Sequence, residues 1–225
     1  MERRPSLWIV DPSLNTPEDR GVAEILSGWS GVSRLFRPSL RDGDGPCPEQ
    51  GYAADGVVVM GSAASVHDRL PWLERLASWL RPLLVGEIRM PVLGICFGHQ
   101  LIAHLAGGSV GEVNEARTKN VGVETSLLDG GRLIPGRHEL RVVVSHREQV
   151  DRLPPGYRAV ATRAACRLDG LEHDELPIHS FQFHPEARED FALRAGFDPG
   201  RIDDRVRADS RRLLEAFRGR VLEGA

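Results

Sequence analysis

Continuous apolar runs alternate with amphipathic stretches through the first half of the chain. The apolar runs predict strands at residues 7–10, 56–60 and 91–93, and residues 32–36 can form a further strand. The run at 56–60 has no polar residue, which is typical of a strand covered on both faces. Apolar residues at helical spacing predict helices at residues 17–29, 71–84 and 101–106. This alternation predicts an α/β fold with a doubly wound, mostly parallel central sheet flanked by helices.

The second half of the chain is richer in strands. Short apolar segments predict strands at residues 121–128, 141–144, 158–162, 167–172 and 178–183. Residues 187–225 are predicted to be helical, with an apolar stripe that we interpret as packing surface rather than a partner site: Leu213, Leu214, Phe217 and Val221. We find no repeat and no linker, so we expect a single domain over residues 1–225.

The net charge of -3 over 225 residues gives no electrostatic reason to expect nucleic acid or a membrane as partner. Cys47, Cys96 and Cys166 are widely spaced without a C-x-x-C, which argues against a disulfide framework and for a reducing compartment. Because no apolar signal segment or spanning stretch is present, we expect a cytoplasmic protein. Nearly all basic residues are arginines, and Lys119 is the only lysine. Arginine suits carboxylate recognition, but codon bias explains this preference better.

The segment Gly94-Ile95-Cys96-Phe97-Gly98 lies between a predicted strand and a predicted helix. Glycines two positions before and after the cysteine allow a tight, strained turn that projects the thiol above the sheet edge. At the start of a helix, backbone N–H groups and the helix dipole favour a thiolate. The segment predicts a nucleophilic cysteine, and a buried structural cysteine is the alternative for this motif alone.

A second motif, His184-Pro185-Glu186, ends the last predicted strand. Because side chains alternate along a strand, Gln182, His184 and Glu186 are expected on one face. A carboxylate that holds one imidazole nitrogen fixes the tautomer and supports the protonated ring. Cys96, His184 and Glu186 would then be nucleophile, general acid and base, and orienting carboxylate. Taken alone, this second motif is also explained by a surface turn.

Together the two motifs resemble the class I, triad-type glutamine amidotransferase family, whose hallmark is a G-x-C-x-G-x-Q elbow and a later H-x-E. Residues 93–100 and 184–186 match this pattern position by position, and residues 105–108 match the family's helix end. Two further family segments have counterparts at residues 55–62 and 144–154. The resemblance covers residues 7–190 and implies a flavodoxin-like α/β fold.

The resemblance also implies a reaction. Cys96 would attack the side-chain amide of glutamine, or another γ-glutamyl carbonyl, and form a γ-glutamyl thioester with release of ammonia. His184 would protonate the departing amine and then activate water, while Glu186 orients the imidazole. The tetrahedral oxyanion would be held by backbone N–H groups of Phe97 and of the Gly61-Ser62 loop.

Four further residues would position the amino acid end of the substrate by this resemblance: Gln100, Ser145, His146 and Arg147. We expect no cofactor and no metal ion, because the sequence has neither a P-loop nor a metal-binding spacing of histidines. The segment after the last predicted strand is too short to contain a synthase. We therefore expect either that the protein docks on a separate ammonia-accepting synthase or that it hydrolyses its substrate freely.

Two departures from the family pattern leave alternatives open. Residues 61–63 read G-S-A where the family has G-G-P, which changes the conformations open to the oxyanion loop. Residues 119–122 read K-N-V-G, without the acidic residue of many relatives. γ-Glutamyl peptidases of the same superfamily also carry a G-S loop. The alternatives are therefore a γ-glutamyl peptidase or hydrolase for larger amides, and a catalytically silent regulatory or binding subunit.

Overall fold

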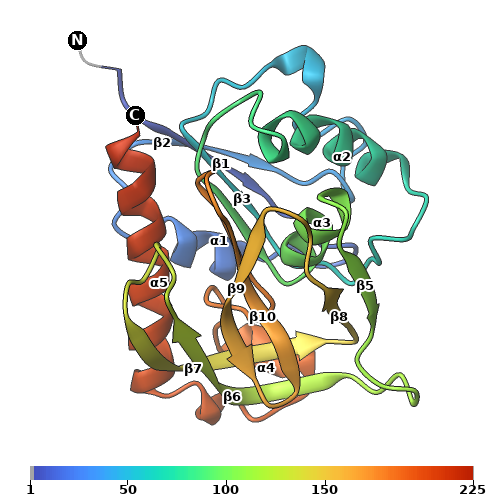
Figure 1. Cartoon of the computed structure of the whole chain (residues 1–225), viewed down its shortest axis with the longest axis vertical. Helices are drawn as coiled ribbons and strands as arrows, with labels where there is room; N and C mark the ends of the chain where they lie inside the picture. Colours follow the sequence, from blue (N-terminus) through green and yellow to red (C-terminus); the bar gives the residue numbers. More distant parts are fainter. Residues whose placement is uncertain (1–2, 225) are drawn as a thin grey trace.

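The computed structural model describes residues 3–224; residues 1, 2 and 225 of the predicted domain lie outside the described residues. A nine-stranded sheet carries helices on both faces (Figure 1). Its parallel part consists of neighbouring strands in the spatial order β2 (Val32–Phe36), β1 (Ser6–Val10), β3 (Gly56–Val59), β4 (Val92–Ile95) and β11 (Ile178–Phe181).

The remaining strands extend this sheet beyond β11 in antiparallel pairing, in the order β10 (Cys166–His173), β9 (Tyr157–Arg163), β6 (Asn120–Asp129) and β7 (Arg137–His146). The predicted α/β fold with a strand-rich second half is therefore confirmed. A separate small sheet pairs β5 (Ser109–Glu112) with β8 (Glu148–Arg152). The sequence did not predict these two strands, because both are short and mostly polar.

Residue alternation along the parallel strands creates two cores, one on each face of the sheet. The odd-numbered residues of β1 pack with α1 (Asp19–Ile25) and α5 (Asp204–Glu223). The even-numbered residues pack with α2 (Pro71–Leu84) and α3 (Phe97–Leu105). Helices thus cover both faces, as the doubly wound prediction requires.

The helix boundaries follow local sequence signals. Helix α2 has the predicted bounds and starts with Pro71, which suits the first helical position. Helix α1 is shorter than the predicted 17–29, because the chain turns at Gly28, whose φ is +77°. Between β2 and β3 the chain forms only the short helix η1 (Pro48–Gln50).

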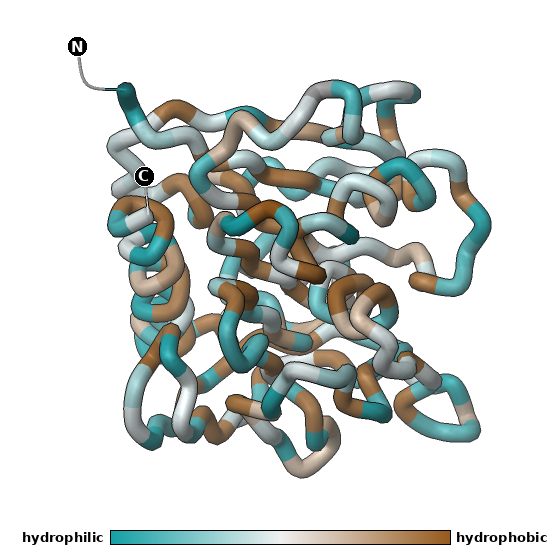
Figure 2. Tube along the Cα trace, turned by 45° about the horizontal axis from the view of Figure 1, so that its top comes forward, coloured by the Kyte–Doolittle hydropathy of each residue, from teal (hydrophilic) through white to brown (hydrophobic). Residues whose placement is uncertain are grey.

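The C-terminal segment forms α4 (Glu189–Ala195), η2 (Pro199–Arg201) and α5. In Figure 2, α5 alternates between hydrophobic and hydrophilic residues along its length. Its predicted apolar stripe is at most 2% exposed and packs against the sheet, which confirms its interpretation as packing surface. No helix within residues 3–224 has the length and apolar character needed to cross a membrane.

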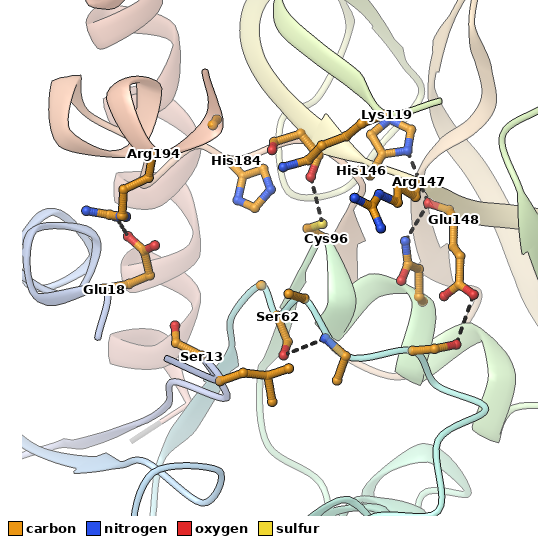
Figure 3. A pocket seen from close by; sticks show the side chains of 18 of the residues that line it. Ser13, Glu18, Ser62, Cys96, Lys119, His146, Arg147, Glu148, His184 and Arg194 are labelled. Carbon is orange, nitrogen blue, oxygen red and sulfur yellow. Dashed lines mark hydrogen bonds and ion pairs between the residues drawn. The ribbon is translucent and has the colours of Figure 1, made fainter. Parts of the chain in front are cut away.

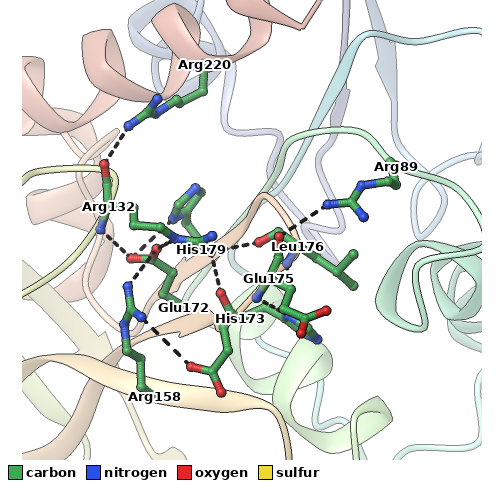
Figure 4. A network of polar contacts seen from close by, with 10 residues as sticks. Arg89, Arg132, Arg158, Glu172, His173, Glu175, Leu176, His179 and Arg220 are labelled. Carbon is green, nitrogen blue, oxygen red and sulfur yellow. Dashed lines mark hydrogen bonds and ion pairs between the residues drawn. The ribbon is translucent and has the colours of Figure 1, made fainter.

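An ion-pair network around the buried Glu172 links the hairpin of β6 and β7 to the hairpin of β10 and β11, close to the first residue of β11 (Figure 4). Glu172 on β10 is fully buried and binds Arg132 and, at 3.2 Å, Arg158. Arg132 also donates to the carbonyl oxygen of Leu176 at 3.0 Å. Through Arg132, this network joins the turn after β6 to the buried Glu172 of β10 and to the turn after β10.

Candidate active site

The predicted elbow forms where β4 meets α3. Cys96 has φ 51° and ψ -100°, a positive φ that is rare for a residue with a side chain. A Cβ atom at Gly98 would lie 2.1 Å from the carbonyl oxygen of Val59, and one at Gly94 would lie 2.7 Å from that of Gly98. Both glycines are therefore required for the close approach of α3 to the strands.

His184 and Glu186 lie beyond the end of β11, and the predicted strand to residue 183 is too long. The pairing of β11 with β4 stops at Phe181, because its partner strand ends at Ile95 and turns into the elbow. His184 and Glu186 therefore do not share a strand face. They meet through a hydrogen bond from Nδ1 of His184 to Oε1 of Glu186, at 2.9 Å.

Cys96 and His184 converge on the same small space beside Gly61. A Cβ atom on Gly61 would lie 2.8 Å from Cε1 of His184 and 3.6 Å from Cβ of Cys96. Figure 3 shows the sulfur and the imidazole facing one cavity. The side chains of Cys96, His184 and Glu186 are all buried, so their charges interact with little screening by water.

The electrostatic surroundings favour a protonated His184. Burial by itself lowers the pKa of His184, but the Cys96 sulfur and the Glu186 carboxylate outweigh it and raise this pKa to about 10. The protonated ring carries a proton on each nitrogen: Nδ1 donates to Glu186, and Nε2 has no hydrogen-bond partner within residues 3–224. The imidazole thus presents a transferable proton next to the sulfur.

The cavity has a volume of about 640 Å³ and opens on both sides of Cys96. In the predicted oxyanion loop, the hydroxyl of Ser62 donates to the carbonyl oxygen of Pro12 at 2.7 Å and accepts from Ala64 N–H at 3.1 Å. The hydroxyl is therefore occupied in shaping the loop. The backbone N–H groups of Ser62 and Phe97 meet no acceptor among the described residues.

All four predicted substrate-positioning residues line the cavity, but two of them already have internal partners. His146 donates from Nδ1 to the carbonyl oxygen of Glu148 at 3.1 Å and accepts at Nε2 from Arg163 at 3.1 Å. Burial and the nearby Arg163 lower the pKa of His146 to about 3, so this ring is neutral. Gln100 donates to the same carbonyl oxygen at 2.6 Å. Both side chains thus build the cavity wall.

Sequence reasoning missed Lys119 as a cavity residue. Lys119 and Arg147 both line the cavity, and neither has a carboxylate within ion-pair distance among the described residues. Burial lowers the pKa of Lys119, and the charge of Arg147 lowers it further, whereas Cys96 raises it. The single lysine of the chain was a signal, but sequence alone did not show that it faces the predicted nucleophile.

His99, which directly follows the elbow, is a structural residue. It is fully buried, donates from Nε2 to the carbonyl oxygen of Leu168 at 3.1 Å and accepts from the hydroxyl of Ser180 at 2.9 Å. Burial lowers the pKa of His99 to about 3. Within residues 3–224, no group of three or more histidine, cysteine or acidic residues could hold a metal ion.

This burial predicts acid sensitivity. A neutral histidine with a lowered pKa stabilises the fold above pH 6.5, and this contribution is lost as the pH falls towards 3. The free energy of unfolding, measured by urea denaturation, should decrease less steeply from pH 6.5 to pH 4 in His99→Gln than in the wild type. His138→Gln, on β7 at the surface, is the matched control and should keep the wild-type slope; equal slopes for both variants would contradict the prediction.

This α/β protein places a cysteine on a strained strand-to-helix turn, facing a hydrogen-bonded His–Glu pair at the carboxyl edge of parallel strands. The family model described as "Glutamine amidotransferase class-I" matches residues 44–191, about two thirds of the chain. The chain belongs to this family, as its motifs indicated.

Several curated relatives are named as one subunit of "GMP synthase [glutamine-hydrolyzing]". The protein of this name from Pyrococcus abyssi is 42% identical over 101 residues, which cover 44% of this chain and 53% of the relative. The one from Archaeoglobus fulgidus is 32% identical over 139 residues, covering 61% of this chain and 69% of the relative. The chain thus spans about half the length of three such archaeal relatives that it matches.

Solved structures show the same fold over nearly the whole chain. A glutamine amidotransferase from Methylobacillus flagellatus has a TM-score of 0.72 at 20% identity, covering 99% of this chain and 96% of its own. One from Thermotoga maritima has a TM-score of 0.71 at 19% identity, covering 99% and 98%. The flavodoxin-like α/β architecture expected from the sequence is therefore the architecture of the family.

Proposed function

We propose that this protein hydrolyses the side-chain amide of glutamine through a γ-glutamyl thioester on Cys96 and releases ammonia. Membership of the class I glutamine amidotransferase family supports the substrate and the overall reaction. The observation that carries the mechanism is the convergence of the buried side chain of Cys96 with the buried, hydrogen-bonded pair of His184 and Glu186 at one cavity.

In the first half of the reaction, the Cys96 thiolate attacks the amide carbon and a C–S bond forms. The carbonyl electrons move to oxygen, and the free N–H groups of Phe97 and Ser62 would hold this oxyanion. When the intermediate collapses, the C–N bond breaks and the nitrogen takes the proton from Nε2 of His184. Ammonia leaves and the thioester remains.

In the second half, Nε2 of His184 takes a proton from water as the water oxygen attacks the thioester carbon. The C–S bond breaks, glutamate departs, and the cysteine and histidine return to their initial protonation. Glu186 keeps Nδ1 as the donor nitrogen in both halves, so Nε2 remains the nitrogen that exchanges protons.

The two unpaired cations of the cavity support an amino acid as substrate. Lys119 and Arg147 line the cavity near Cys96, and the charge of Arg147 lowers the pKa of Lys119, so an anion bound beside both would offset their repulsion. The α-carboxylate of a γ-glutamyl compound is such an anion. We therefore assign Lys119, together with the predicted Arg147, to this carboxylate.

Replacement of Lys119 by methionine should raise the KM for glutamine and lower kcat/KM by roughly 10- to 100-fold, as expected for loss of a charged hydrogen bond. Turnover of 4-aminobutanamide, which lacks the α-carboxylate, should barely change. Initial rates with both substrates measure the effect. Arg117→Met removes a nearby exposed cation outside the cavity and should leave both rates unaltered; equal losses for both substrates in K119M would refute the assignment.

We further propose that the ammonia is delivered to a separate synthase subunit. Free ammonia is mostly protonated at neutral pH, so efficient transfer requires a shielded path. The relatives named as one subunit of a glutamine-hydrolysing GMP synthase support this assembly, and the other subunit of such a synthase is the first partner to test.

A second candidate function is hydrolysis of larger γ-glutamyl amides. The cavity continues past His184, the proposed proton donor to the leaving group, to a wall formed by the ion pair of Glu18 and Arg194 at 2.5 Å (Figure 3). Space on that side would admit an amine larger than ammonia.

Glutamate release from glutamine and from γ-glutamyl dipeptides by the purified chain, with and without a synthase subunit, tests these functions. We expect a higher kcat/KM for glutamine, and stimulation by the partner. A higher kcat/KM for γ-glutamyl dipeptides would instead favour the second candidate function, hydrolysis of larger γ-glutamyl amides. If neither substrate released glutamate under either condition, a catalytically silent subunit would be the better description.

A further inference from the structure

The buried side chain of Gln182 contacts the sulfur of Cys96, although the two residues are 86 positions apart in the sequence. Its Nε2 donates to Sγ at 3.6 Å, and its Oε1 accepts from Nε2 of Gln100 at 3.2 Å. Gln182 lies in the bend between the end of β11 and His184. The reaction described above gives it no role.

The hydrogen-bond network determines which end of the Gln182 amide faces the sulfur. The backbone carbonyl oxygen of Glu148 can only accept, so the nitrogen of Gln100 must face it, at 2.6 Å. The second N–H of Gln100 then points to Gln182, whose oxygen must accept it. The nitrogen of Gln182 is therefore the end directed at Cys96.

This orientation is anchored in the interior. The same carbonyl oxygen accepts from Nδ1 of His146, and Nε2 of His146 accepts from Arg163. Arg163 is in turn held by Asp169 at 2.8 Å, with both side chains fully buried. Because every donor in this series has a defined acceptor, neither amide can flip without leaving a buried polar group unpaired.

The sulfur lies between two groups of opposite effect. The carbonyl oxygen of Ser145, 3.9 Å from Sγ, accepts a hydrogen bond from the thiol and so favours the protonated form. The N–H of Gln182 donates to the sulfur and is a much better partner for the thiolate, since hydrogen bonds to charged acceptors are the stronger ones. Gln182 is thus a hydrogen-bond donor to the Cys96 sulfur, on which Ser145 acts only as an acceptor.

We infer that Gln182 is a catalytic residue that stabilises the thiolate of Cys96 and fixes its direction through an N–H···S hydrogen bond. This inference rests on the proposed function insofar as the thiolate is the nucleophile. It extends the site beyond Cys96, His184 and Glu186 to a donor that touches the reacting atom.

The test compares Gln182→Met, which removes the donor at similar length, with Gln182→Glu, which keeps the shape of the side chain. Mass spectrometry of the Cys96 peptide gives the rate of iodoacetamide alkylation across pH. For Q182M we expect the pH of half-maximal rate to rise by about one unit, and alkylation at pH 7 to slow about tenfold. For Q182E, where a carboxylate would face the thiolate, we expect at least the same slowing at pH 8.

Gln149→Met, on β8 and outside the cavity lining, is the matched control and should show the wild-type profile. Thermal unfolding shows whether each variant is folded. If Q182M does not fold, the isosteric Q182E provides the test. Wild-type alkylation profiles in folded Q182M or Q182E would overturn the inference. Because alkylation needs no glutamine, a shifted profile in a protein that releases no glutamate would defeat only the proposed function.

Discussion

Cys96→Ala is expected to abolish glutamate release from glutamine, with a loss on the order of 10⁴-fold or more. Removal of a covalent nucleophile leaves only the contribution of binding and of the oxyanion donors. Alanine retains the Cβ atom, so the strained turn at φ 51° and the fold should persist. Glutamate release and thermal unfolding of the purified variant measure the two effects separately.

Cys47→Ala is the matched control, because Cys47 lies in the loop before η1 and does not line the cavity. It should retain wild-type turnover. A Cys96→Ala protein that kept a tenth or more of the activity would exclude the thioester mechanism, whereas an inactive but folded variant with unchanged glutamine binding supports it.

Gly98→Ala should be among the most damaging substitutions that add a single methyl group to the described residues. Its Cβ atom would lie 2.1 Å from the backbone oxygen of Val59, and no side-chain rotation can relieve a clash with backbone. Helix α3 would have to move away from β3, which should destabilise the fold by about 3 kcal/mol or more. The same movement displaces Cys96 and the Phe97 N–H, so activity should also fall, roughly 10²-fold in any folded fraction.

Gly219→Ala provides the comparison, because Gly219 lies inside α5 and a Cβ atom there would meet nothing within 4 Å. This variant should gain up to about 1 kcal/mol, the usual preference of a helix for alanine over glycine. Urea denaturation of both variants tests the pair. If the two substitutions changed stability equally, the close approach at the elbow would not be the reason for Gly98.

Local sequence patterns predicted most elements because their causes are local. Helix α2 has its predicted bounds since Pro71 and the apolar spacing act within the helix itself. The end of β11 was predicted wrongly because a strand needs a partner, and β4 turns away at Ile95. Strands β5 and β8 carry little apolar pattern of their own and exist through their pairing with each other.

For the site, the sequence by itself determined the strained turn at Cys96, since its glycines act over a few bonds, and the chain order of Cys96, His184 and Glu186. Only the tertiary structure decided that Lys119 faces the cavity and that Gln182 donates to the sulfur. It also showed that His146 supports the wall rather than offering a free nitrogen. The physical reason is that these contacts join segments far apart in the chain, and the order of strands in the sheet, not any local pattern, sets which segments meet.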